Sequence, residues 1–95
     1  MEHLYVITYD IADDRRWRRV FKTMRAYGEW LQLSVFQCRL DRTRLLQMES
    51  ALNESIHHEE DHVLILDLGP VEGVKLQVRS LGKRFDILRR EPMIF

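Results

Sequence analysis

Asp10 is the residue of this sequence that is best placed to do chemistry. It ends an apolar and aromatic run that begins at His3, and runs of this composition form strands. A carboxylate at the carboxyl end of a strand is held by a rigid scaffold, where it can ligate a divalent cation or act as a general base. Asp is also common in turns, because its side chain accepts hydrogen bonds from the following backbone. When Asp10 is considered by itself, a turn residue is the favoured interpretation.

A second copy of the chain changes what Asp10 can do. One carboxylate makes a poor magnesium site, because such sites combine one or two carboxylates with water and substrate phosphates. In a homodimer the two-fold axis brings the same residue in twice, so one Asp per chain supplies two ligands. A Mg²⁺ ion at Asp10 is therefore easier to hold between two copies than on one.

A row of cations follows Asp10 in the first expected helix. The apolar residues of this segment recur with helical spacing at Trp17, Val20, Phe21 and Met24. The opposite side carries five basic residues, which we call the basic face: Arg15, Arg18, Arg19, Lys22 and Arg25. Such a surface can neutralise the phosphates of a nucleic acid, and few acids alternate with the bases to form the i,i+4 pairs of a merely solvated helix. We therefore predict nucleic-acid binding, with a solvated helix face as the alternative.

Two other groups of residues carry weaker signals. Residues 57–62 read His-His-Glu-Glu-Asp-His, a composition that resembles a metal cluster. Their spacing is not that of a His-Glu-x-x-His helix or a zinc finger, so a solvated helix end is the favoured interpretation. Ser34 and Cys38 have no identifiable base partner, and we expect both to be small buried strand residues rather than nucleophiles.

The elements that position these residues follow from periodicity and from the breakers between them. Strands are expected at residues 3–11, 32–40, 61–68 and 85–88. One helix is expected from Asp13 or Asp14 to Tyr27, with Gly28 as a left-handed cap. A second helix is expected after Asp41, with its apolar stripe ending at Ile56. The segment 71–82 is ambiguous, since its apolar residues fit both a strand and a helix.

We expect these elements to form the ferredoxin-like β-α-β-β-α-β fold of the α+β class. This fold is a four-stranded antiparallel sheet with two helices on one face. Its first and third strands are central, and the expected strands at 3–11 and 61–68 are nearly continuous apolar runs. Residues 1–95 are expected to form a single domain, because a chain of this length supports one hydrophobic core.

Composition narrows the class of protein. Fifteen basic and fifteen acidic residues give no net charge, so any case for nucleic acid rests on how the charges are distributed. The single cysteine is typical of a reducing compartment. Neither a signal peptide nor a run of about 20 apolar residues is visible. We expect a cytoplasmic protein that does not enter a membrane.

Several segments taken together resemble the CRISPR-associated protein 2 family, from the adaptation module of bacterial and archaeal antiviral immunity. The resemblance covers the whole chain and is carried by Tyr9-Asp10-Ile11, the arginine-rich helix, Tyr27-Gly28, Gln32-Leu33-Ser34-Val35-Phe36-Gln37-Cys38 and the strand at 61–68. It implies a ferredoxin-like homodimer in which the C-terminal strand, within residues 83–95, is exchanged onto the sheet of the partner. The terminal apolar residues 93–95 would then be covered at the dimer interface.

The resemblance also implies a site and a role. Asp10 matches the strand-end aspartate that family members place opposite its dimer mate across a shared Mg²⁺, and we carry it over as metal ligand and catalytic residue. Members are described as metal-dependent nucleases of single-stranded RNA or double-stranded DNA. They also form the central dimer that bridges two dimers of the CRISPR integrase when spacers are captured and inserted. Further residues match the motif region without an assigned chemical step, namely Tyr9, Arg15, Arg16, Ser34 and Phe36. Arg16 joins the residues of the basic face as a candidate nucleic-acid contact.

The residues and the resemblance together leave three functions open. The first is a Mg²⁺-dependent phosphodiesterase that uses two copies of Asp10 and acts on RNA or DNA. The second is a nucleic-acid-binding scaffold that sets the distance between integrase sites without catalysis of its own. The third rests on the fold alone and is a toxin-type ribonuclease or a small-molecule regulatory domain. The lack of a Gly-rich ligand loop lowers the regulatory option.

Overall fold

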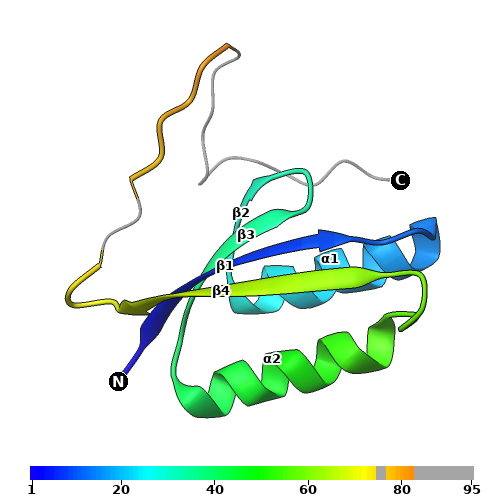
Figure 1. Cartoon of the computed structure of the whole chain (residues 1–95), viewed down its shortest axis with the longest axis horizontal. Coiled ribbons are helices and arrows are strands. Elements are labelled where there is room, and N and C mark those ends of the chain that lie inside the picture. Colours follow the sequence, from blue (N-terminus) through cyan, green and yellow to red (C-terminus); the bar gives the residue numbers. More distant parts are fainter. Residues whose placement is uncertain (75–76, 83–95) are drawn as a thin grey trace.

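Two helices pack on one face of an antiparallel sheet in the computed structural model of this protein (Figure 1), which describes residues 1–74 and 77–82. The predicted α+β class and ferredoxin-like arrangement are confirmed. The predicted strand at 85–88 and the exchanged C-terminal strand lie outside the described residues, and the single domain of residues 1–95 stays a prediction. The elements are β1 (His3–Asp10), α1 (Asp14–Tyr27), β2 (Glu29–Gln32), β3 (Val35–Leu40), α2 (Arg42–Ser55) and β4 (His62–Pro70).

The sheet has the order β2-β3-β1-β4, and every neighbouring pair is antiparallel. β1 is central, as predicted, and pairs with β3 on one side and with β4 on the other. The prediction that the strand at 61–68 is central is wrong, because this segment forms β4 at an edge of the described sheet. β3 takes the central place, since the chain makes one more strand before α2 than the sequence reveals.

The strand predicted for residues 32–40 is confirmed over Val35–Leu40, but its start is wrong. A tight turn at Leu33 and Ser34 separates it from β2, a strand that was not predicted. Leu33 has a φ of 39°, a left-handed conformation that is uncommon for a residue with a side chain. The Trp30 indole N–H donates to the Leu33 carbonyl at 2.9 Å and fastens the turn. No Gly, Asn or Pro marks this hairpin, which is why its composition reads as one continuous strand.

Both helices begin where an aspartate caps them, as predicted. The Asp13 carboxylate accepts from the Arg16 N–H at 3.0 Å, and the Asp41 carboxylate accepts from the Arg44 N–H at 2.8 Å. The left-handed cap predicted at Gly28 is wrong, because its φ of −154° is extended backbone. Gly28 is instead a point of close approach to β3, where a Cβ would overlap the Cys38 Sγ and the Gln37 carbonyl.

The core lies between the helices and the covered face of the sheet. Alternate residues of β1 and β3 meet one apolar stripe from each helix, as a strand period of two and a helix period of 3.6 require. Among these residues Ile7, Val20 and Phe36 are 0 % exposed. The buried cluster consists of Tyr5, Ile7, Tyr9, Val20, Phe21, Met24, Phe36, Cys38, Leu40, Met48 and Leu52.

The other face of the sheet carries no described helix, and we call it the open face. Between the Val6–Leu66 and Asp10–His62 pairs it is made of the β1 and β4 residues that alternate with the covered ones, namely Val6, Thr8, Asp10, His62, Leu64 and Leu66. The pairing register places Val6 opposite Leu66 and Thr8 opposite Leu64. The two leucines are 45 % and 49 % exposed. The open face therefore presents apolar side chains to solvent in the described structure.

Beyond β4 the described chain has little regular structure. β4 runs through Gly69 and Pro70, and the Val71 N–H then donates to the Glu2 carbonyl at 3.0 Å. The described parts of the ambiguous segment, residues 71–74 and 77–82, form neither a helix nor a strand. No helix within the described ranges is both long enough and apolar enough to cross a membrane.

Candidate metal and nucleic-acid site

Asp10 is the last residue of β1, and its exposed side chain belongs to the open face. Its carboxylate makes no hydrogen bond or ion pair with any residue in the ranges 1–74 and 77–82. The interpretation of Asp10 as a turn residue is therefore wrong, since a turn residue of this kind accepts a hydrogen bond from the following backbone. The carboxylate is available to a cation or a substrate.

A different aspartate holds the loop that follows Asp10. The Asp61 side chain is fully buried and accepts from the backbone N–H groups of Ala12, at 2.9 Å, and of His57, at 2.8 Å. It also accepts from the Arg16 guanidinium, at 2.7 Å from Nε and 3.2 Å from Nη2. Four donors converge on one carboxylate and tie the β1–α1 loop to the loop before β4. Sequence reasoning grouped Asp61 with the other residues of 57–62 and missed this role, because its partners come together only in the fold.

The contact between Asp61 and Arg16 shifts the pKa of both side chains. The hydrogen bonds from Arg16, together with those from His57 and Ala12, hold the pKa of Asp61 well below its usual range. The same pair raises the pKa of Arg16, and Glu60 adds a second ion pair at 3.0 Å. Arg16 is thus engaged within the protein, whereas the prediction that it contacts nucleic acid stays a prediction.

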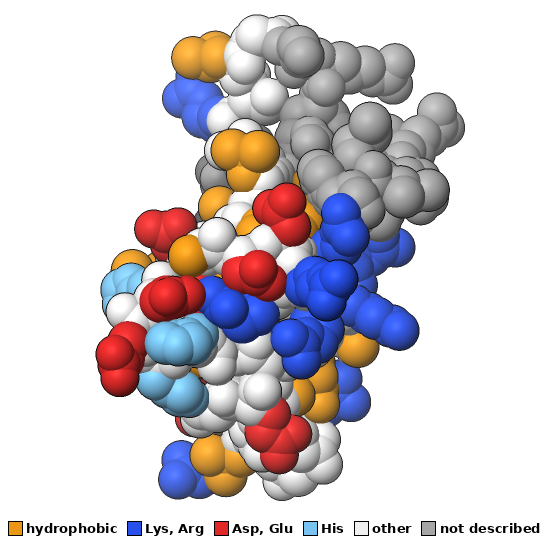
Figure 2. All heavy atoms as spheres, turned by 90° about the vertical axis from the view of Figure 1, so that its right-hand side faces the viewer, with side chains coloured by type: hydrophobic (Ala, Val, Ile, Leu, Met, Phe, Trp, Pro, Cys, Tyr) orange, Lys and Arg blue, Asp and Glu red, His pale blue; other side chains and the backbone are white. Residues whose placement is uncertain are grey.

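The basic face lies on the solvent side of α1. Its members are all exposed, and none makes an ion pair with another residue of the described chain: Arg15, Arg18, Arg19, Lys22 and Arg25. Figure 2, which looks onto the end of the molecule where α1 begins, shows Lys and Arg side chains gathered on one side and His, Asp and Glu side chains beside them. A surface of unpaired cations can bind the phosphates of a nucleic-acid backbone.

Ser34 connects three parts of the structure. It lies in the turn between β2 and β3, so its predicted place in a strand is wrong. Its hydroxyl accepts from the Trp17 indole N–H at 2.9 Å, and its carbonyl accepts from the Tyr9 backbone N–H at 3.1 Å. Ser34 therefore fixes α1 and the end of β1 to the hairpin. These contacts are structural.

Two other reactive side chains are buried in the core. The Tyr9 hydroxyl is buried beside Ser34: burial raises its pKa, and the Ser34 side chain lowers it to a smaller extent. Burial also raises the pKa of the Cys38 thiol to about 12, so it stays protonated and is no nucleophile at neutral pH. The expectation that Cys38 is a small buried strand residue is confirmed.

The donor set of one chain fits a divalent cation only in part. No group of three or more His, Cys, Asp or Glu side chains gathers as a metal site within residues 1–74 and 77–82. The His57–His62 segment is largely exposed: His58 Nε2 lies 3.1 Å from the Asn53 carbonyl, and His57 Nδ1 accepts from the Glu59 N–H at 3.3 Å. Asp10 supplies one hard oxygen ligand, which suits Mg²⁺, and the rest would come from water, phosphate or a second copy.

The chain has clear relatives among known proteins. The family model described as CRISPR associated protein Cas2 matches residues 3–72. The chain is 64% identical over 94 residues to a CRISPR-associated endoribonuclease Cas2 of Geobacter sulfurreducens, with 99% of each chain covered. It is 62% identical over 93 residues to a CRISPR-associated endoribonuclease Cas2 of Rhodospirillum rubrum, with 98% of this chain and 91% of the relative covered.

Solved structures agree with this relationship. A crystal structure of Streptococcus pyogenes Cas2 at pH 6.5 superposes with a TM-score of 0.70 and 26% identity, covering 83% of this chain and 99% of that one. A hypothetical protein from Thermus thermophilus superposes with a TM-score of 0.75 and 28% identity, covering 90% and 100% of the two chains. The family match, the identities and the shared fold lead to one conclusion: this chain belongs to the Cas2 family of CRISPR-associated proteins.

Proposed function

We propose that this protein is a CRISPR adaptation protein that binds nucleic acid as a homodimer and cleaves phosphodiester bonds at Asp10. The observation that carries the proposal is the exposed Asp10 carboxylate, which has no described partner and ends the strand before the basic face. Cleavage of RNA is supported by the names of relatives that are 64% and 62% identical, both called endoribonucleases, and double-stranded DNA is proposed as an alternative substrate. As an adaptation protein it would act with dimers of the CRISPR integrase to capture and insert spacers.

The residues of this chain divide the work of cleavage between them. Asp10 would hold a Mg²⁺ ion together with the Asp10 of a second copy, and a bound divalent cation supplies Lewis-acid stabilisation of phosphate charge. The basic face would hold the sugar-phosphate backbone next to this carboxylate, through residues such as Arg18 and Lys22. Asp61 keeps the Asp10 loop in place through its bond to the Ala12 N–H.

The open face supports the homodimer. Leu64 and Leu66 are about half exposed on a sheet surface that no described helix covers. A contiguous exposed apolar patch of this kind marks an interaction surface, since a monomer pays for leaving it in water. A second copy bound there would bring two Asp10 side chains onto the same side of the assembly. The second carboxylate is needed because one chain supplies only part of the ligands of a divalent cation.

A non-catalytic scaffold is the second candidate function. It is favoured by one observation, namely that a single chain gathers no group of three metal-binding side chains within its described residues. In this role the basic face binds the DNA backbone, and the dimer sets the distance between integrase active sites. Asp10 would then be dispensable for spacer insertion.

The test compares Asp10→Asn with Asp14→Asn, a matched control that removes an exposed carboxylate in the first turn of α1. Each repurified protein is assayed for Mg²⁺-dependent cleavage of single-stranded RNA and double-stranded DNA. Each is also assayed for spacer acquisition in cells that supply the integrase. The proposal expects cleavage by the wild type and by Asp14→Asn, and only background cleavage by Asp10→Asn.

Two outcomes separate the candidates. Equal cleavage by Asp10→Asn and the wild type would overturn the nuclease assignment, because the activity would then come from a contaminant or from other residues. Full spacer acquisition by Asp10→Asn, with no cleavage by any variant, would establish the scaffold role. Loss of acquisition when the basic face is reversed in charge would support nucleic-acid binding under either candidate.

A further inference from the structure

The β1–β4 register places His62 directly opposite Asp10. Directly opposed residues of an antiparallel pair have Cβ atoms about 4.5–5.5 Å apart and point to the same face of the sheet. Both side chains are exposed. The carboxylate of Asp10 therefore has an imidazole as its nearest cross-strand neighbour, at the point where β1 ends and β4 begins.

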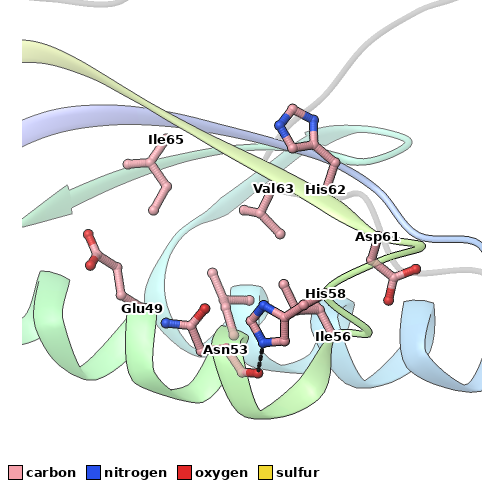
Figure 3. Close-up of a pocket in the computed structure, with 9 residues that line it drawn as sticks. Glu49, Asn53, Ile56, His58, Asp61, His62, Val63 and Ile65 are labelled. Atoms are coloured by element: carbon pink, nitrogen blue, oxygen red, sulfur yellow. Dashed lines mark hydrogen bonds between the residues drawn. The ribbon is translucent and has the colours of Figure 1, made fainter.

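The ring of His62 is directed differently from the rest of its loop. His62 is one of the residues that line the groove between β4 and α2, but in Figure 3 its ring points away from α2, whereas Val63 points toward α2 and His58 lies in the groove. The dashed line marks the contact of 3.1 Å between His58 Nε2 and the Asn53 carbonyl. The His62 ring has no hydrogen bond or ion pair within the described parts of the chain, so its nitrogens are available on the side of Asp10.

The local structure holds this pair of side chains in a fixed relation. Asp61 precedes His62 and bonds the N–H of Ala12, two residues after Asp10, at 2.9 Å. The bidentate contact from Arg16 anchors the same carboxylate to α1. The loop after β1 and the start of β4 are thus tied to each other on the covered side, while Asp10 and His62 project from the open side.

We propose that His62 is the second protein donor of the Asp10 site, so that each chain contributes one oxygen and one nitrogen ligand. The inference rests on the proposed function, because it assumes a divalent cation at Asp10. A second copy of the chain would complete a set of two carboxylates and two imidazoles. Imidazole nitrogen suits cobalt, nickel and zinc better than magnesium, whereas carboxylate and water suit magnesium. The site consequently binds transition metals more tightly than Mg²⁺.

The test measures metal binding directly, without a nucleic-acid substrate. Co²⁺ and Mg²⁺ are titrated separately into the full-length protein by calorimetry at about pH 8, where imidazole is neutral. The visible absorption of bound Co²⁺ reports nitrogen ligation as a second readout. The variants are His62→Gln, His62→Ala and Asp10→Asn. His58→Gln is the matched control, because His58 is an exposed histidine of the loop before β4 whose ring lies in the groove, away from Asp10.

We expect the wild type and His58→Gln to bind Co²⁺ more tightly than Mg²⁺. Both His62 variants should weaken Co²⁺ binding by at least about tenfold and change its absorption spectrum, since even outer partners of ligands are worth that much. Their Mg²⁺ affinity should change by less than about threefold, because oxygen ligands carry it. Asp10→Asn should weaken the binding of both metals.

Each contrary result has its own meaning. Unchanged Co²⁺ affinity and spectrum in both His62 variants, with weakened binding in Asp10→Asn, would overturn the assignment of His62 and leave the Asp10 metal site standing. Unchanged binding in Asp10→Asn, or no binding by the wild type, would overturn the metal part of the proposed function and this inference with it. Thermal unfolding of each variant confirms that the exposed substitutions leave the fold intact.

Discussion

The carboxylate of Asp61 and the guanidinium of Arg16 meet at 2.7 Å and join the loop before β4 to the first turn of α1. The same carboxylate accepts the Ala12 N–H, so this ion pair lies behind the loop that carries Asp10. Because the Asp61 side chain is fully buried, its replacement should lower the stability of the whole fold as well as disturb the site.

We expect Asp61→Asn to lower the free energy of unfolding at neutral pH by about 1–3 kcal/mol, because the amide leaves buried donors poorly paired. Urea denaturation followed by circular dichroism measures the effect. Asp67→Asn is the control, since Asp67 is a half-exposed carboxylate with only two partners among the described residues, the His3 ring and the Gly69 N–H, each at 2.9 Å. Equal stability of wild type and Asp61→Asn would show that the four contacts contribute nothing net.

The contribution of Asp61 should depend on pH. The Arg16 hydrogen bonds hold its pKa in the folded protein well below the value of about 3.9 in the unfolded chain. The resulting stabilisation is complete above that unfolded value and is lost as the pH falls through the folded pKa. The stability difference between wild type and Asp61→Asn should therefore be constant from about pH 7 to pH 5 and shrink below about pH 4. A difference that grows on acidification would contradict the assignment.

Gly28→Ala tests the close approach of α1 and β3. A Cβ at this position would overlap the Cys38 Sγ and the Gln37 carbonyl, and the backbone atom cannot move away cheaply. We expect a loss of about 1–3 kcal/mol in unfolding free energy, as for other overpacked sites. Gly73→Ala is the matched control, because its Cβ would lie 3.9 Å from the Pro70 carbonyl, an ordinary contact. Similar stability losses in both variants would mean that packing at Gly28 is not special.

Charge reversal on α1 tests the basic face. Arg18→Glu combined with Lys22→Glu should weaken binding to duplex DNA and lower the slope of log affinity against log salt by about 1 for each phosphate contact removed. Arg42→Glu is the control, since Arg42 is an exposed cation at the start of α2. The measurement is fluorescence anisotropy across a salt series. A salt slope identical to that of the wild type would argue that the basic face is only solvated.

Leu66→Glu tests the open face as a dimer surface. Leu66 is 45 % exposed opposite Val6, and burying a charge there without a partner would be costly. We expect the variant to be monomeric at concentrations where the wild type is dimeric, as measured by light scattering after size exclusion. Leu46→Glu removes a leucine that is 50 % exposed on α2 and should leave the dimer intact. A dimeric Leu66→Glu protein would place the interface elsewhere.

Much of the fold could be predicted from local patterns. The apolar stripe of α1 and the aspartate caps at Asp13 and Asp41 depend on residues close together in the sequence, and the structure confirms them. The β2–β3 hairpin could not be predicted, because Leu33 takes a positive φ that no turn residue announces. Missing that turn also misplaced the central strand, since one uncounted strand changes the order of the sheet.

Only those parts of the candidate site that depend on neighbouring residues in the sequence could be predicted. Asp10 stands out because it ends an apolar strand, and the basic face stands out because α1 has a clear period. Asp61 reaches Arg16 across 45 positions and Ala12 across 49, so its role depends on how the strands pair. The same is true of His62, which meets Asp10 only through the β1–β4 register. Charged residues in a polar loop give no signal of such contacts before the fold is known.

Asp10 lies on the same side of the sheet as Leu64 and Leu66. A second copy that covers these leucines also reaches the carboxylate, so that association and completion of the site become one event. Turnover per molecule would then rise with protein concentration below the dissociation constant of the dimer and become constant above it. The amount of protein that a cell makes would thereby set its specific activity without a separate regulator.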